Sequence, residues 1–122
     1  MKLRIKGNSI RIRLSKTEVQ RLASGSALED SVSFVRNRFG YSVKPISNGD
    51  LLSASYEEGN ITLYVPLTLL ADWPTNTVTG FETNMPVEHS GHLHLLLEKD
   101  FKCIDQTMED QSDYYENPDK NC

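Results

Sequence analysis

The first fourteen residues hold the strongest candidate for chemistry, a set of basic side chains at alternating positions: Lys2, Arg4, Lys6, Arg11 and Arg13. Apolar residues fill the positions between them, and strict alternation is the signature of half-buried β-strands. The Gly7-Asn8 pair in the middle is typical of a two-residue hairpin turn. The sequence therefore predicts a hairpin with one apolar face and one basic face.

The basic face is the predicted anion-binding site. In this hairpin Arg4 faces Arg11, and like charges opposite each other destabilise a sheet unless an anion lies between them. Arginine binds phosphate and carboxylate groups through paired hydrogen bonds, so the candidate partners are phosphate, a nucleotide and an acidic protein segment. The net charge of −4 argues against nucleic acid, because domains that bind it are normally basic overall. The competing interpretation is a solvated strand face, which is ordinary in antiparallel sheets.

Two histidines and a glutamate form the second candidate. His92, His94 and Glu98 share one face of a predicted strand, with the imidazoles about 6.6 Å apart, as in part of a divalent-metal site. No later histidine completes the ligand set, so the sequence predicts no bound metal and no other cofactor. In an alternative, enzymatic hypothesis the same side chains supply acid and base groups beside the basic face.

Charge is distributed unevenly along the 122 residues. Positions 1–44 hold ten of the thirteen Lys and Arg residues against three acidic ones, whereas positions 105–122 hold six acidic residues and Lys120. This asymmetry predicts attraction between the two ends. We expect one domain over 1–104 and an acidic tail over 105–122. The tail should dock on the basic face, within the chain or in a homodimer, with Tyr114 and Tyr115 beside the arginine stems.

The remaining elements position these candidates. Ser15 and Glu18 have the spacing of a capping box, which predicts a helix start. A second helix is expected over 66–73 with Thr68 as its cap. Strands are expected over 28–35, 41–46, 51–56, 61–65, 78–83 and 92–97. Since two-residue turns join only antiparallel strands, the expected fold is α+β, a mainly antiparallel sheet or partly open barrel of about eight short strands with two short helices. No internal repeat is evident.

The class of protein follows from what the chain lacks. Its longest uncharged apolar-rich stretch, 61–71, is too short for a membrane span, and no apolar segment follows Met1 as it would in a secretory signal. Cys103 and Cys122 are the only cysteines, which favours free thiols in a reducing cytoplasm.

Both ends of the chain resemble a family of small bacterial proteins of unknown function. The resemblance rests on positions 1–14, on the helix start at Ser15, Glu18 and Val19, and on C-terminal residues that include Glu98-Lys99-Asp100-Phe101, Cys103, Glu109-Asp110, Ser112-Asp113 and Asn117-Pro118. It implies a small bacterial cytoplasmic protein whose acidic tail belongs to the family pattern, and it implies no activity, substrate or cofactor.

No complete catalytic motif occurs in the chain, so the enzymatic question stays open at this point. We expect a non-enzymatic binding or interaction module whose basic hairpin face engages an anionic partner or its own acidic tail. The alternative is an enzyme that acts on a phosphate ester or nucleotide at the same face.

Overall fold

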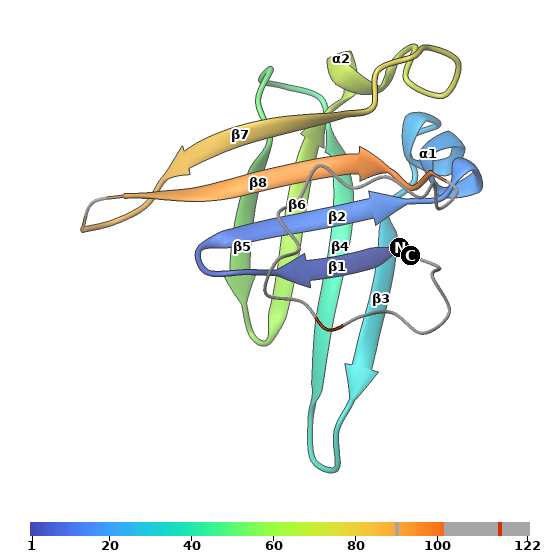
Figure 1. Ribbon diagram of the computed structural model, residues 1–122. Helices are drawn as coiled ribbons and strands as arrows, with labels where there is room; N and C mark the ends of the chain where they lie inside the picture. Colours follow the sequence, from blue (N-terminus) through green and yellow to red (C-terminus); the bar gives the residue numbers. More distant parts are fainter. Residues whose placement is uncertain (90, 102–114, 116–122) are drawn as a thin grey trace.

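The computed structural model describes residues 1–89, 91–101 and 115 (Figure 1). These residues form the following elements: β1 (Lys2–Ile5), β2 (Ser9–Leu14), α1 (Lys16–Ala23), β3 (Leu28–Ser33), β4 (Arg38–Ile46), β5 (Ser53–Glu57), β6 (Asn60–Pro66), α2 (Leu67–Leu70), β7 (Gly80–Pro86) and β8 (His92–Lys99). In this part of the chain no helix is long and apolar enough to cross a membrane.

The strands form two four-stranded sheets, with the order β1-β2-β8-β7 in sheet A and β3-β4-β6-β5 in sheet B. The strands of sheet A cross those of sheet B as two separate layers (Figure 1). In each sheet the two central strands are parallel, β2 with β8 and β4 with β6, and the outer pairs are antiparallel.

The prediction of an α+β fold is confirmed, but that of a mainly antiparallel sheet or partly open barrel is wrong, because both sheets are mixed and the described strands close no barrel. The reason is that a tight turn determines only the direction of the two strands that it joins. Each hairpin then pairs with another hairpin through strands far apart in the sequence, and these pairs are parallel.

The order ββαββ occurs twice, from β1 to β4 and from β5 to β8. The two sheets also have equivalent topology. Strands β1, β2, β8 and β7 of sheet A correspond in order to β5, β6, β4 and β3 of sheet B. Buried residues follow the same repeat, since Ile12, Leu14, Val19 and Leu22 each lie 51 positions before the buried residues Leu63, Val65, Leu70 and Trp73. The sequence alone did not reveal the repeat because these pairs share little more than apolar character.

The core lies between the two sheets, and α1 and α2 contribute to it. The side chains of Val19 and Leu22 on α1 are buried in it. Trp73, just after α2, is fully buried against Phe81, with the ring centroids 4.9 Å apart, and its Nε1 donates to the carbonyl of Val78 at 2.8 Å. Burying each such side chain stabilises the fold by about 1.5–3 kcal/mol. Helix α2 is one turn long and has no side-chain cap, so the prediction of Thr68 as cap is wrong.

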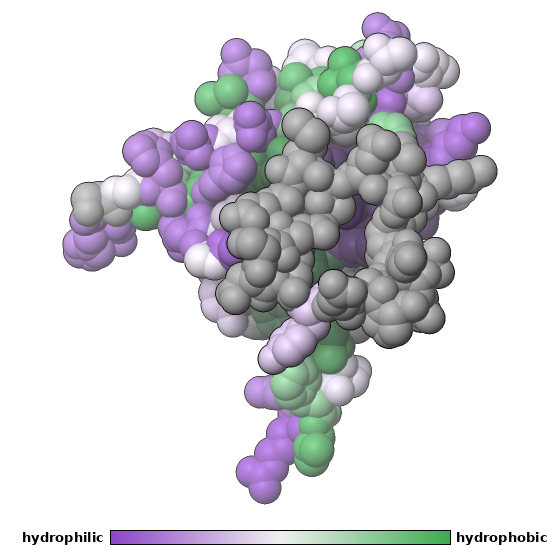
Figure 2. Space-filling view, viewed as in Figure 1, coloured by the Kyte–Doolittle hydropathy of each residue, from purple (hydrophilic) through white to green (hydrophobic). Residues whose placement is uncertain are grey.

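The hairpin of β3 and β4 projects beyond the two layers (Figure 1). Apolar side chains near its tip are exposed, by 50% at Val32, 63% at Phe34 and 100% at Val35. They form the apolar part of the projection at the bottom of Figure 2, whose end is hydrophilic. The projecting end of this hairpin adds little to the core, whereas Leu28 and Val43 at its base belong to the core.

Candidate functional site

The basic hairpin forms with the predicted register. Lys2 lies opposite Arg13 and Arg4 opposite Arg11, so these four residues share the outward face of sheet A. The fifth predicted residue, Lys6, is exposed in the turn between β1 and β2. Gly7 begins the turn with φ +56, a conformation that glycine adopts without strain. Opposite the basic face, Ile12 is fully buried, whereas Ile5 at the end of β1 is 55% exposed. The apolar face therefore has the predicted phase, but the core ends before Ile5.

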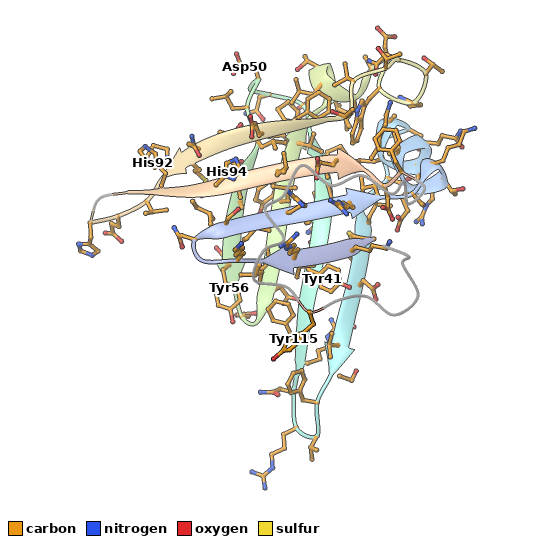
Figure 3. All side chains as sticks on the ribbon, viewed as in Figure 1. Tyr41, Asp50, Tyr56, His92, His94 and Tyr115 are labelled. Atoms are coloured by element: carbon orange, nitrogen blue, oxygen red, sulfur yellow. The ribbon has the colours of Figure 1, made fainter. Side chains whose placement is uncertain are left out.

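Strand β8 brings the second predicted set of residues to the same face. The parallel pairing of β2 with β8 places Ser9 beside His94 and Arg13 beside Glu98. His92 stands at the exposed start of β8 (Figure 3). The basic face thus continues into a histidine and a carboxylate that lie about eighty positions away in the sequence.

Glu98 lies between the two arginines of β2. Its Oε1 atom is 3.2 Å from Arg11 Nε and 3.6 Å from Arg13 Nε, and that oxygen is shielded from solvent. The close approach of β7 and β8 at this point requires Gly80, because a Cβ atom there would collide with the carbonyl oxygen of Leu97 and crowd Glu98. A backbone position without a side chain therefore allows Glu98 to reach the arginines.

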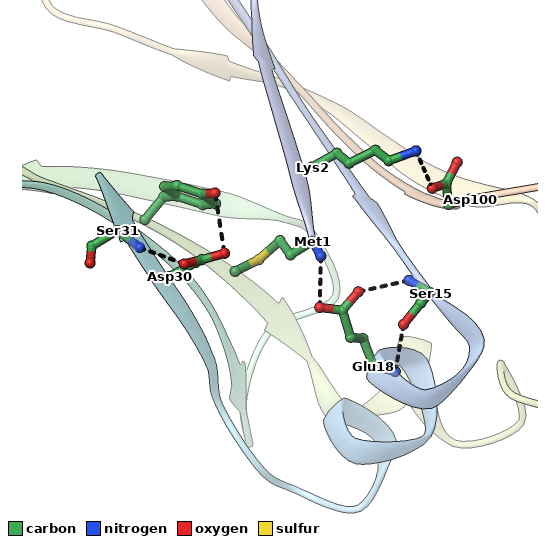
Figure 4. A network of polar contacts seen from close by, with 8 residues as sticks. Met1, Lys2, Ser15, Glu18, Asp30, Ser31 and Asp100 are labelled. Carbon is green, nitrogen blue, oxygen red and sulfur yellow. Dashed lines mark hydrogen bonds and ion pairs between the residues drawn. The ribbon is translucent and has the colours of Figure 1, made fainter. Parts of the chain in front are cut away.

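A second carboxylate binds the edge of the basic face. Lys2 Nζ lies 2.8 Å from Asp100 Oδ2, and the hydrogen bond from Lys2 holds the pKa of Asp100 below its usual value, although partial burial opposes this (Figure 4). Lys2 remains largely exposed, with 71% of its side chain accessible.

The capping box forms as predicted and also ties the start of β1 to α1. Ser15 Oγ accepts from the backbone N–H of Glu18, and Glu18 Oε1 accepts from that of Ser15 (Figure 4). The N-terminal ammonium of Met1 donates to Glu18 Oε2 at 2.7 Å. Burial alone raises the pKa of Glu18, but these hydrogen bonds outweigh it, so the pKa lies below its usual value.

His94 connects a hydroxyl to a carboxylate. Its Nδ1 atom lies 3.3 Å from Ser9 Oγ and its Nε2 atom 3.1 Å from Glu82 Oε2 on β7. The side chain of His94 is 37% exposed and that of Glu82 is 69% exposed. Within the described residues, no three His, Cys, Asp or Glu side chains gather in the manner of metal ligands. The arrangement of hydroxyl, imidazole and carboxylate has the components for proton transfer.

Most of the predicted tail, 105–122, lies outside the described residues, as do both cysteines. Tyr115 is described, and its side chain is fully exposed (Figure 3). Within the chain, Tyr115 therefore does not pack beside the arginine stems, whereas its packing on a second copy in a homodimer stays a prediction. Nothing in the structure tests the docking of the other tail residues.

Sequence reasoning missed the outward face of sheet B, which is hollowed and polar. A cavity of about 630 Å³ lies there, and its lining includes hydroxyl groups from β4, β5 and β6. The sequence signal was the alternation of Asn60, Thr62 and Tyr64 with buried apolar residues along one strand. Polar residues on the solvent side of one strand do not by themselves indicate a polar hollow, because the hollow depends on which strands lie beside it.

The comparisons with known proteins agree with the resemblance of the two chain ends. Neither a curated protein nor a solved structure matches this chain. A family model, described as a family of unknown function (DUF7009), matches residues 1–119 and so covers the two sheets and nearly all of the acidic C-terminal part. The chain therefore belongs to this family of unknown function.

Proposed function

We propose that the protein is a non-enzymatic binding module and that its basic face, formed by Lys2, Arg4, Lys6, Arg11 and Arg13, engages an anionic group of a partner. The observation that carries this proposal is the sharing of one carboxylate by two arginines at Glu98. Two guanidinium groups and one carboxylate leave a net charge of about +1 and several N–H donors for an external oxygen. The partner chemistry that fits is a run of carboxylates, from the acidic tail or from another protein, or a phosphate group.

The exposure of these side chains suits binding more than catalysis. Arg11 is 29% and Arg13 is 44% exposed, and both stand on a sheet face beside Lys2. Partly exposed arginines keep enough mobility to meet different anions and enough support to hold a bidentate geometry. A binding surface of this kind should be sensitive to salt, because screening acts over about 8–10 Å at physiological ionic strength.

The test is a charge-removing variant with a matched control. We expect Arg11→Ser/Arg13→Ser to bind a labelled poly-glutamate peptide about five- to thirtyfold more weakly, since two partly exposed ion pairs contribute about 1–2 kcal/mol together. Arg21→Ser/Arg36→Ser removes the same charge from exposed positions on α1 and on the β3–β4 turn, and should retain affinity. Fluorescence anisotropy at low and high salt measures both. Equal loss in the two variants would show a response to net charge alone, and no loss would reject the site.

A second candidate function rests on the contacts of His94. With His94 as base and Glu82 as its orienting carboxylate, Ser9 is placed as a nucleophile, and Arg11 lies next along the same face of β2 to hold a phosphate ester. The test is release of p-nitrophenol from its phosphate and acetate esters by the parent chain and by Ser9→Ala. Turnover that Ser9→Ala abolishes would favour this enzyme over the binding module. Absence of turnover by the parent chain would remove it.

A further inference from the structure

The outward face of sheet B carries a row of polar side chains, one from each strand. Glu29 on β3 lies beside Ser42 on β4, Ser42 beside Thr62 on β6, and Thr62 beside Ser55 on β5. Cross-strand neighbours on one face of a sheet lie about 4.5–5.5 Å apart between Cβ atoms. Three of the four side chains are short hydroxyls, so the centre of this face is low and lined with groups that both donate and accept hydrogen bonds.

The hydroxyls are oriented by one another and shielded. Ser42 Oγ donates to Thr62 Oγ1 at 3.2 Å, and Ser55 Oγ lies 3.2 Å from Tyr64 Oη. Ser42 is 8% exposed and Thr62 is 9% exposed, which is unusual for hydroxyl side chains on the outward face of a sheet. Each hydroxyl still has hydrogen-bonding capacity that these contacts leave unused.

Longer side chains surround this low centre and make it a cavity of about 630 Å³, with a rim that includes Arg38, Lys44, Glu57 and Tyr64. Asn60 also lines the cavity, and its amide lies over Gly40, where a Cβ atom would collide with the amide oxygen. The Asn60 Nδ2 atom donates to the carbonyl of Glu58 at 3.2 Å. The structure thus provides a hollow of small-molecule size with its polar groups held in place.

We propose that this cavity binds a small polyhydroxylated molecule of the size of a mono- or disaccharide. Hydroxyl groups match the donor and acceptor character of the Ser42, Thr62 and Ser55 floor, whereas an apolar ligand would leave those groups unpaired. In the part of the chain that the structure describes, neither Arg38 nor Lys44 forms an ion pair, so both have donors available.

The charge of the rim argues for a ligand without a strong charge. Four acidic residues and two basic ones line the cavity: Glu29, Asp30, Glu57 and Glu58, with Arg38 and Lys44. This excess of negative charge disfavours an anionic ligand. The carboxylates can accept hydrogen bonds from the hydroxyl groups of a sugar, and the side chains of Arg38 and Lys44 can donate hydrogen bonds to those hydroxyl groups. This site goes beyond the proposed anion-binding function, because it lies on the other sheet and uses none of the same residues.

The experiment is amide chemical-shift mapping of the full chain with a panel of sugars: glucose, galactose, mannose, ribose, sucrose and maltose. We expect at least one of them to shift amides of β4 and β6 at millimolar concentration, and inorganic phosphate and glycine to leave these amides unchanged. Ser42→Ala/Thr62→Val removes both partners of one hydrogen bond and so leaves neither unpaired, and it should weaken binding about tenfold.

The control variants distinguish binding in the cavity from binding elsewhere on the protein. Thr17→Val/Ser26→Ala makes the same chemical changes at exposed positions outside the cavity and should bind as the parent does. If the first double variant fails to fold, Ser55→Ala/Tyr64→Phe tests the other hydroxyl pair. The proposal is overturned if no sugar of the panel shifts amides of β4 and β6, or if a folded hydroxyl-deleted variant keeps full affinity. Arg11→Ser/Arg13→Ser should leave sugar binding unchanged, so failure of one site does not imply failure of the other.

Discussion

Replacing Glu98 by Gln should strengthen anion binding on the basic face while it destabilises the free protein. The substitution preserves the shape of the side chain and removes the charge that lies 3.2 Å from Arg11 Nε and 3.6 Å from Arg13 Nε. An anion that binds these arginines is repelled by Glu98 in the parent chain. The variant removes that repulsion, and it also leaves two neighbouring guanidinium groups without their shared partner.

The magnitude follows from Coulomb's law. For an anion about 7 Å from the Glu98 carboxylate, repulsion is about 0.6 kcal/mol at the dielectric constant of water and about 2.4 kcal/mol at an effective value of about 20. Because Glu98 is partly buried, with 26% of its side chain exposed, the expected gain lies between these limits, about three- to sixtyfold in affinity. Loss of the charged contacts should lower the free energy of unfolding by about 1–2 kcal/mol.

Isothermal titration with inorganic phosphate and with a poly-glutamate peptide measures the affinity, and urea denaturation measures the stability. Adding phosphate should recover part of the lost stability, since a ligand that binds only the folded state stabilises it. Glu88→Gln, in the exposed turn between β7 and β8, is the control of equal charge change. Anion affinity of Glu98→Gln that equals or falls below that of the parent would refute the proposed role of the shared carboxylate.

Three further outcomes test the fold. Ile12→Ala should lower the free energy of unfolding by about 2–5 kcal/mol, whereas Ile5→Ala, with 55% of the residue exposed, should cost only about 1 kcal/mol; similar losses in urea denaturation would contradict the assigned boundary of the core. The pKa of Glu18 is lower in the folded state than the usual 4.5, so its contribution to the free energy of unfolding is complete above about pH 5 and is lost as the pH falls through the folded pKa. Glu18→Gln should therefore lose less stability than the parent chain between about pH 6 and pH 3, as measured by urea denaturation. Gly80→Ala should destabilise the β7–β8 pair by about 1–3 kcal/mol, because the added methyl group meets the backbone of Leu97, and an unchanged melting temperature would disprove that contact.

Local chemistry made parts of the fold predictable. The register of β1 and β2 follows from one glycine turn and the alternation of isoleucine with arginine, since a slip by one residue would bury the arginines. The start of α1 follows from Ser15 and Glu18, whose side chains satisfy each other's backbone groups within a single turn. In both cases the interacting residues are close in sequence, so the pattern contains the interaction.

Burial at the ends of elements was less predictable. Ile5 has the same phase as Ile12, so periodicity alone places it on the apolar face, yet 55% of it is exposed. The tyrosines of the tail were assigned a role from charge complementarity, yet Tyr115 is exposed. Alternation along a strand shows on which face a residue lies. Whether the residue is buried depends on how far the rest of the fold covers that face.

The sequence by itself determined the basic face, because its residues and its turn lie within fourteen positions. Only the tertiary structure decided what accompanies that face. The parallel pairing of β2 with β8 joins residues 85 positions apart, such as Ser9 and His94, and puts Glu98 between two arginines. Likewise, the hydroxyls of Ser42 and Thr62 meet only because β4 and β6 pair in sheet B. Pairing between hairpins depends on how their buried faces fit together, and no local pattern records that fit.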